Sequence, residues 1–199
     1  MGSLLEMLTE QLGGDRVEKI GSQIGADENA TRGAISAALP LLINALSRNA
    51  ASSDGAGKLS QALSRDHDGS ILENLSGYLD KPDTNAGEGI LRHVLGARQG
   101  TVEKGLSKSS GLDTGSVGKL MGMLAPLLMG SIGKVKRENN MDENSLAGYL
   151  GQERAGLERS EPQAMGVIGK LLDSDGDGDV DASDLVKHGM NLFGKFFKQ

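Results

Sequence analysis

Apolar side chains recur at helical spacing along nearly the whole chain. One stripe of leucines runs over 4–12, and a second apolar stripe runs over 35–46. Their steps of three and four residues match the period of an α-helix, and no segment shows the strict alternation of a half-buried strand. The most apolar stretches, 39–46 and 120–132, are far shorter than the roughly 20 residues of a membrane span. The pattern therefore predicts an all-α protein without membrane insertion.

The chain also carries an internal repeat. Residues 25–46 align without gaps to residues 111–132, because both stretches start with Gly-x-Asp and reach Pro-Leu-Leu at the same distance. Two echoes extend the match: RVEKI and TVEKG lie upstream, and LSGYL and LAGYL lie downstream. The repeat predicts two related multi-helix units, about 4–79 and 90–150, joined by the turn-rich linker 80–89.

Together these units form a predicted helical domain over 1–151. Asp27 and Asp113 stand where the N-caps of its two most apolar helices are expected. Each of these helices contains a proline, Pro40 in the first and Pro126 in the second. Because proline removes a backbone hydrogen bond inside a helix, we expect kinks that wrap both helices around a shared core. A moving hinge is the alternative.

Composition narrows the class of protein further. The chain has 199 residues, a formal net charge of −6 and no Cys, which excludes disulfides, thiolate metal sites and a Cys nucleophile. The N-terminus carries Glu6 and Glu10 where a signal peptide needs a basic flank and an uninterrupted apolar run. We expect a soluble protein that is cytoplasmic by default.

The C-terminal segment 152–199 contains the clearest chemistry, in the stretch DSDGDGDVDASD over 173–184. Calcium prefers 6–8 oxygen ligands, and a twelve-residue EF-hand loop supplies them from fixed places around a glycine at the sixth. Gly178 takes that sixth place. The predicted ligands at places one, three, five, seven, nine and twelve are Asp173, Asp175, Asp177, Asp179, Asp181 and Asp184. The alternative is a solvated acidic turn without a metal.

Amphipathic stretches flank this loop on both sides, as in an EF-hand over 160–197. The predicted inner stripe of the entering helix is Ala164, Val167, Ile168 and Leu172, and that of the exiting helix is Leu185, Met190, Phe193 and Phe197. Most EF-hands have Glu at the twelfth place, where this chain has the shorter Asp184. We therefore expect Mg²⁺ to compete and calcium to bind with a dissociation constant on the order of 10⁻⁵ to 10⁻³ M.

A weaker copy of the same pattern lies at SRDHDGSILENL, residues 64–75. Asp66 and Asp68 take ligand places, but Leu75 stands where the terminal carboxylate belongs. The site would be incomplete unless Glu73 takes part. The competing interpretation is a helix start, in which the two aspartates add negative charge ahead of a capping box formed by SILE.

Charge is distributed unevenly along the chain. Residues 90–137 hold eight basic side chains against Glu103 and Asp113. Such asymmetry is one sign of a nucleic-acid partner. The bases are spread over several helices, however, and no aromatic side chains lie between them for base stacking. We prefer a solvated face, or pairing with the acidic C-terminal segment.

No catalytic arrangement emerges from the sequence. The three histidines, His67, His93 and His188, are scattered, and His93 is interpreted as a helix-surface residue. No Gly-rich loop follows a strand, so a phosphate-binding loop lacks its context. We therefore expect a non-enzymatic protein. All three Phe lie in the amphipathic stretch 184–199, which packs on its own domain or docks a protein partner or a second copy.

The stretch GLDTGSVGKLMGMLAPLLMGSIGK and its first-half echo GADENATRGAISAALPLLINAL resemble the bacterial YidB-like family, over about 1–150. This family is a domain of unknown function rich in Gly, Leu and Gln. The resemblance implies an all-helical fold that has been likened to a homeodomain, which hints at DNA binding. It assigns no catalytic, cofactor or base-reading residue to this chain.

Three hypotheses follow. The first is a non-enzymatic calcium-binding protein, in which one EF-hand loop stabilises or regulates a helical interaction domain. The second is a nucleic-acid-binding protein that uses the bases of 90–137. The third is a structural module with a vestigial loop.

Overall fold

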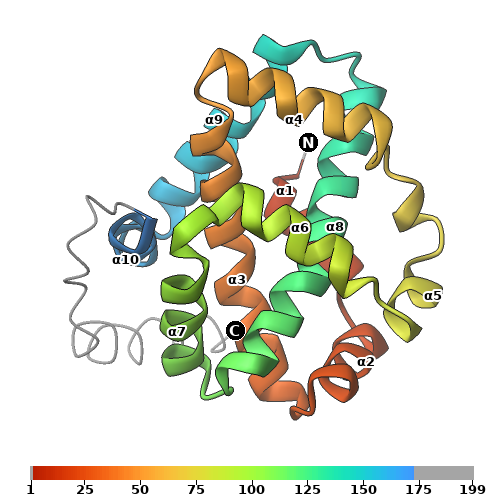
Figure 1. Cartoon of the computed structure of the whole chain (residues 1–199), viewed down its shortest axis with the longest axis vertical. Coiled ribbons are helices and arrows are strands. Elements are labelled where there is room, and N and C mark those ends of the chain that lie inside the picture. Colours follow the sequence, from red (N-terminus) through yellow and green to blue (C-terminus); the bar gives the residue numbers. More distant parts are fainter. Residues whose placement is uncertain (1, 173–199) are drawn as a thin grey trace.

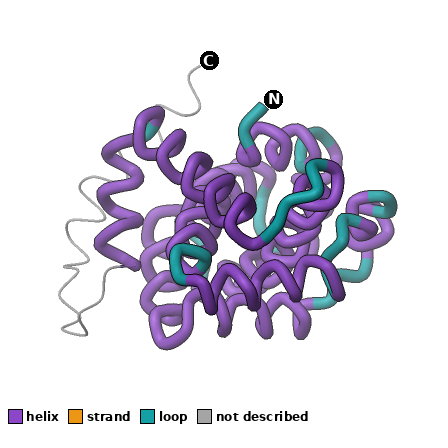
Figure 2. The backbone as a smooth tube through the Cα atoms, turned by 90° about the horizontal axis from the view of Figure 1, so that it is seen from above, coloured by secondary structure: helices purple, strands orange, loops and turns teal. Residues whose placement is uncertain are grey.

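The structure, a computed structural model, describes residues 2–172. Within these residues the chain forms α-helices and two short 3-10 helices joined by loops, without a strand (Figures 1 and 2). The predicted all-α class is therefore confirmed for the described part of the chain. In chain order the elements are α1 (Leu4–Gln11), α2 (Asp15–Ile24), α3 (Glu28–Asn49), α4 (Ser53–Arg65), η1 (Ser70–Leu72), α5 (Leu75–Asp80), α6 (Thr84–Leu95), η2 (Gly96–Arg98), α7 (Gln99–Ser110), α8 (Thr114–Glu138), α9 (Glu143–Ser160) and α10 (Pro162–Leu172).

The two longest helices of the described chain, α3 and α8, lie in the middle of the fold and pack on each other (Figure 1). Most of their residues from Ala34 and Val117 onward are buried, and the other helices cover them. Both predicted N-caps are confirmed: the Asp27 carboxylate accepts from the Ala30 amide at 2.9 Å, and Asp113 accepts from the Ser116 amide at 3.0 Å. These caps satisfy amides that a helix start leaves unpaired.

Glycines end the helices that precede α3 and α8. Gly25 closes α2 with φ of 73°, and Gly111 closes α7 with φ of 76°. Residues with a side chain rarely adopt this left-handed backbone conformation, so Gly is favoured at both positions. Each glycine lies two residues before a capping aspartate, which makes the Gly-x-Asp motif a helix stop followed by a helix start.

Pro40 and Pro126 lie inside α3 and α8, as predicted. Pro126 has no amide hydrogen, so the carbonyl of Gly122, four residues earlier, loses its helical partner. Gly87 of α6 packs directly on this carbonyl, and a Cβ atom built at Gly87 would overlap the Gly122 oxygen. The glycine therefore lets α6 approach α8 at backbone distance, where a Cα–H group faces the freed oxygen.

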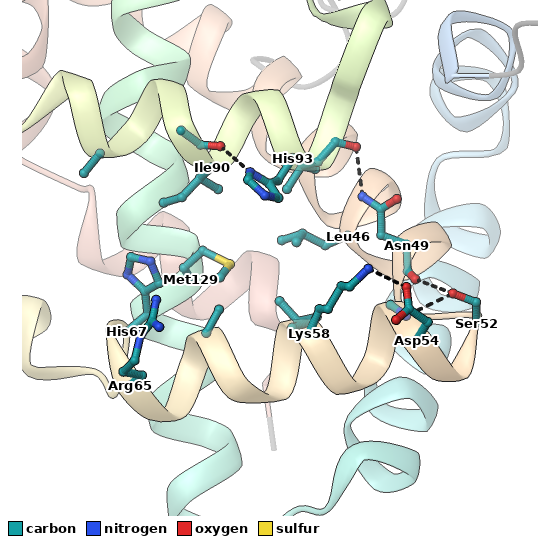
Figure 3. Close-up of a pocket in the computed structure, with 16 residues that line it drawn as sticks. Leu46, Asn49, Ser52, Asp54, Lys58, Arg65, His67, Ile90, His93 and Met129 are labelled. Atoms are coloured by element: carbon teal, nitrogen blue, oxygen red, sulfur yellow. Dashed lines mark hydrogen bonds and ion pairs between the residues drawn. The ribbon is translucent and has the colours of Figure 1, made fainter.

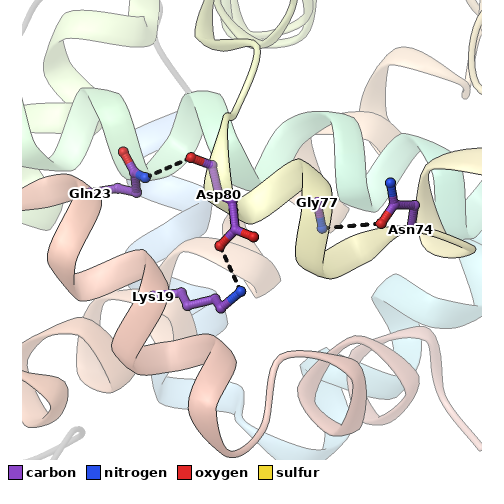
Figure 4. A network of polar contacts seen from close by, with 5 residues as sticks. All are labelled: Lys19, Gln23, Asn74, Gly77 and Asp80. Carbon is purple, nitrogen blue, oxygen red and sulfur yellow. Dashed lines mark hydrogen bonds and ion pairs between the residues drawn. The ribbon is translucent and has the colours of Figure 1, made fainter.

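A small polar network fixes α5 to α2 (Figure 4). The Lys19 Nζ atom lies 2.6 Å from a carboxylate oxygen of Asp80, and the Gln23 side-chain amide donates to the Asp80 carbonyl at 3.2 Å. At the other end of α5, the Asn74 side chain accepts from the Gly77 amide at 3.2 Å. Both ends of this short helix therefore have polar partners.

Helices run across two of the predicted boundaries. Most of the expected linker 80–89 is helical, because Asp83 accepts from the Ala86 amide at 3.0 Å and starts α6 at Thr84. The expected division between residues 151 and 152 falls inside α9. Leu157, beyond that division, belongs to the same hydrophobic core as Leu4. Residues 2–172 therefore share one core.

Helix α8 is the longest helix among the described residues. It is longer than the apolar stretch 120–132 on which the prediction rested, and by length and composition it passes as a membrane span. In the fold, however, 78% of its most apolar window is buried among the other helices. This burial is what the core helix of a globular domain requires.

Candidate functional site

The acidic loop predicted to bind calcium lies outside the described residues. This applies to Asp173, Asp175, Asp177, Asp179, Asp181 and Asp184 and to the predicted exiting helix. The described chain leads to the loop through α10, and Leu172 is both the last described residue and the residue before the first predicted ligand. Residues 162–172 are thus helical, as expected for a segment that enters such a loop.

Helix α10 packs on α3, α7 and α9. Its buried residues are Met165, Ile168 and Leu172, at steps of three and four residues. Two of them belong to the predicted stripe, whereas Ala164 and Val167 are half-buried. Met165 was missed because the stripe was drawn for contact with an exiting helix, and in the structure the face of α10 is turned toward the domain.

The weaker acidic segment, residues 64–75, forms protein contacts in the structure. The Arg65 guanidinium donates to both carboxylate oxygens of Asp66, to Oδ1 at 3.0 Å and to Oδ2 at 2.7 Å. Asp68 accepts from the Ser70 amide at 3.0 Å and lies 3.7 Å from Arg137. These contacts lower the pKa of both carboxyl groups, chiefly through the hydrogen bond from Arg65 to Asp66 and the bond from Ser70 to Asp68.

No group of three or more His, Asp or Glu side chains that could hold a metal occurs within residues 2–172. The structure therefore brings no third ligand to Asp66 and Asp68, and metal binding there stays a prediction. The proposed capping box at SILE is wrong. Ser70 begins only the 3-10 helix η1, and α5 starts at Leu75 because Asn74 provides its cap.

The basic side chains of 90–137 are spread over α6, η2, α7 and α8. The cluster at the end of α8 already has partners inside the protein. Lys134 lies 3.9 Å from Glu138, Lys136 donates to the Ser64 hydroxyl at 2.8 Å, and Arg137 lies 3.7 Å from Asp68. These contacts are made within the described domain. Pairing of the bases with the acidic C-terminal segment and binding of nucleic acid both stay predictions.

A groove that the sequence analysis missed lies between α4 and α6 (Figure 3). The two helices form its walls, and Leu46 of α3 and Met129 of α8 contribute to its floor. Its volume is about 600 Å³. His67, after α4, and His93, on α6, both line it. These histidines looked scattered because only the packing of α4 and α6 on α8 brings them to one groove.

The polar groups of this groove are held by a few short contacts. The His93 Nδ1 atom lies 3.1 Å from the Gly89 carbonyl. Since a carbonyl oxygen only accepts, Nδ1 carries the hydrogen and Nε2 is left without one on the neutral ring. The Asn49 side chain donates to the Val94 carbonyl at 2.9 Å and ties α3 to the end of α6. Burial lowers the pKa of His67, which favours its neutral form.

The fold thus defines an all-helical domain built around two buried, proline-containing helices. The chain belongs to the DUF937 family, described as a bacterial protein of unknown function, whose model matches residues 6–135. The predicted resemblance to a bacterial domain of unknown function is thereby confirmed, over a narrower range than 1–150. No curated protein and no solved structure matches the chain. The match ends within α8, so α9, α10 and the loop 173–184 lie beyond it.

Proposed function

We propose that this protein is a non-enzymatic calcium-binding protein, in which residues 173–184 form one EF-hand loop attached to the DUF937 domain through α10. The main support is the twelve-residue pattern of ligands, which follows a helical segment. An EF-hand loop begins directly after its entering helix. The chain is helical up to Leu172, the last described residue, and the sixfold aspartate pattern starts at the next residue.

The packing of α10 supports a coupling between calcium and the domain. Met165, Ile168 and Leu172 are buried against α3, α7 and α9. A ligand that binds only the folded form stabilises it, by about 2.7 kcal/mol when its concentration is one hundred times the dissociation constant. If the loop and α10 fold as one unit, this free energy reaches the domain through that buried face. Calcium then acts as a stabiliser or regulator of a helical interaction domain.

The nature of the partners follows from the same proposal. The domain offers an all-helical surface for a protein partner or for self-association, and calcium is the ion expected in the loop, with Mg²⁺ as competitor. We propose that the protein is soluble and cytoplasmic.

We also propose that the two halves of the domain are related units. Several matched features support this. Gly25 and Gly111 both end helices in the left-handed conformation, and the aspartates that follow them cap α3 and α8. Each of these two helices then contains one proline at the corresponding place. Matched positions of the helix stop, the cap and the proline are what a duplicated helical unit would retain.

Thermal unfolding with and without calcium tests the proposed function. For a protein of this size, a gain of about 2.7 kcal/mol corresponds to a melting temperature roughly 5–11 °C higher. We expect this rise in wild type, a smaller one with magnesium, and none in Asp173→Ala. Asp54→Ala is the matched control, because Asp54 is an exposed aspartate remote in sequence from the loop. Equal melting temperatures with and without calcium in wild type would contradict the proposal.

The same protein preparation tests the alternative hypothesis, which is nucleic-acid binding by the basic side chains of 90–137. That hypothesis requires salt-dependent retention on DNA that weakens when Lys134, Lys136 and Arg137 are changed to Ala. The calcium hypothesis requires the calcium-dependent shift without such retention. Asp66→Ala adds a test of the weaker segment, since a reduced calcium response in this variant would indicate a second site there.

A further inference from the structure

The groove between α4 and α6 has the dimensions of a small-molecule site. Its volume of about 600 Å³ lies within the roughly 300–1,000 Å³ of typical ligand pockets. Helices α4 and α6 both pack on α8, which leaves the groove open between them (Figure 3). At one end, the hydrogen bond from Asn49 to the Val94 carbonyl joins α3 to α6. The groove is therefore bounded by fixed helices.

The inner surface of the groove is apolar. Leu46, Leu59 and Met129 are buried core residues whose side chains line it from below, and Ile90 and Val94 line it from α6 while only half-buried. An apolar ligand body in this position would cover the exposed parts of Ile90 and Val94, because Leu46, Leu59 and Met129 are at most 9% exposed. Removing such surface from water is the main favourable term in apolar binding. The lining therefore selects for a hydrocarbon-like body.

The charged side chains around the groove are mostly basic, although the whole chain is acidic. Lys58 and Arg65 line it from α4, together with one acid, Asp54. Asp66 already binds the Arg65 guanidinium, so Lys58 is the cation that the inference uses. Lys58 Nζ lies 2.6 Å from Asp54, but the two side chains are 75% and 76% exposed. Exposed ion pairs of this kind contribute little, so the ammonium group is available to an anion of a ligand at small cost.

From this combination we infer that the groove between α4 and α6 is a binding site for a small amphipathic anion, such as a medium-chain carboxylate. The apolar body lies over Leu46 and Met129, and the anionic head lies at Lys58. This site uses residues of α3, α4, α6 and α8 only, so it is independent of the proposed calcium loop.

The thioether methyl group of Met129 provides a direct reporter of binding. Wild-type full-length protein with ¹³C-labelled methionine methyl groups is titrated with decanoate in calcium-free buffer, and the Met129 signal is assigned with Met129→Leu. We expect the Met129 signal to shift in a saturable way. Met121, which is fully buried in α8 and does not line the groove, serves as an internal reference.

Gly89 allows the groove to be filled without disturbing the core. It lines the groove, and a Cβ atom built there has no protein atom within 4 Å. We expect Gly89→Leu to abolish decanoate binding while the fold is retained. Gly148→Leu is the matched control, because Gly148 lies in α9, outside the groove, with equally open space at its Cβ position. This control should bind decanoate like wild type.

The contribution of charge to the binding affinity is measured by changing the ligand and by changing Lys58. Decanol has a similar body without the anion, and Lys58→Gln removes the cation. We expect each change to weaken binding roughly threefold to tenfold. Acetate, which has no apolar body, should not shift Met129. Sedimentation with vesicles containing phosphatidylglycerol separates a membrane lipid from a free ligand, and we expect no cosedimentation.

Several results would overturn the inference. If the Met129 signal does not shift at saturating decanoate, the groove is not a binding site. The same conclusion follows if a folded Gly89→Leu variant binds decanoate like wild type. If decanol and decanoate bind with equal affinity, the groove does not recognise the anionic group of the ligand. Vesicle binding that Gly89→Leu abolishes would assign the groove to a membrane lipid in place of a free anion.

Discussion

The contact between Gly87 and Gly122 gives the sharpest test of how α6 packs on α8. Gly87 of α6 lies against the carbonyl that Pro126 leaves without a helical partner in α8. In Gly87→Ala, the new methyl group overlaps that oxygen. The obstacle is backbone of a buried helix, so relief requires α6 to move away from α8, and with it the buried Leu91.

The magnitude follows from two opposing effects. Overpacking of a close contact costs about 1–3 kcal/mol, and more where backbone must shift. Replacing Gly by Ala inside a helix returns up to about 1 kcal/mol. We expect a net loss of about 2 kcal/mol for Gly87→Ala, which lowers the melting temperature by roughly 4–8 °C in a chain of this size.

Gly89→Ala is the matched control in the same helix. Its Cβ position is open, so only the gain in helix propensity applies, and we expect stabilisation by about 0.5–1 kcal/mol. Urea unfolding followed by circular dichroism measures both variants beside wild type. If Gly87→Ala is as stable as wild type, with an unchanged dependence on urea concentration, the account of the α6–α8 contact is refuted.

Three further predictions concern individual polar groups. The Tyr78 hydroxyl donates to the Met123 carbonyl at 3.0 Å, whereas the buried Tyr149 hydroxyl lies near the Glu153 carboxylate but forms no hydrogen bond of ordinary geometry among the described residues. Tyr78→Phe should therefore cost about 1 kcal/mol in urea unfolding, and Tyr149→Phe should be neutral or stabilising; equal losses would contradict this. Burial lowers the pKa of His67, so its stabilising contribution is present above about pH 6.5 and is lost as the pH falls further. The melting temperature of His67→Gln should accordingly decline less between pH 7 and 5 than that of wild type, and parallel curves would argue against the assignment. Hydrogen bonds from the Ser116 hydroxyl and amide lower the pKa of Asp113, so its contribution is present above about pH 4 and is lost on acidification. The acid-unfolding curve of Asp113→Ala should be shallower in this range, and a curve as steep as that of wild type would exclude the cap as its source.

Features encoded within a few neighbouring residues could be predicted from the sequence. The caps at Asp27 and Asp113 were found because an N-cap depends on the residues next to it. The prolines were placed correctly because each stands inside a long apolar pattern. Helix starts at which two local signals compete were predicted less well. SILE offered a capping box, but Asn74 supplies the amide oxygen that starts α5.

Features that depend on packing between distant segments were missed. Nothing near Gly87 in the sequence indicates that it faces the carbonyl of Gly122. His67 and His93 line one groove only because α4 and α6 both pack on α8. The orientation of α10 was likewise set by α3, α7 and α9, which turned Met165 into the core. The proposed calcium loop does not depend on such packing, since its pattern of ligands is contained in twelve consecutive residues, and it stays a prediction.

Isothermal titration of calcium into the full-length protein is the most direct test of the central claim, that residues 173–184 hold a calcium ion. The claim predicts heat that saturates at one ion per chain, with a dissociation constant on the order of 10⁻⁵ to 10⁻³ M, and no such heat for Asp173→Ala. An absence of heat from wild type at millimolar calcium, or an unchanged titration of Asp173→Ala, would contradict it.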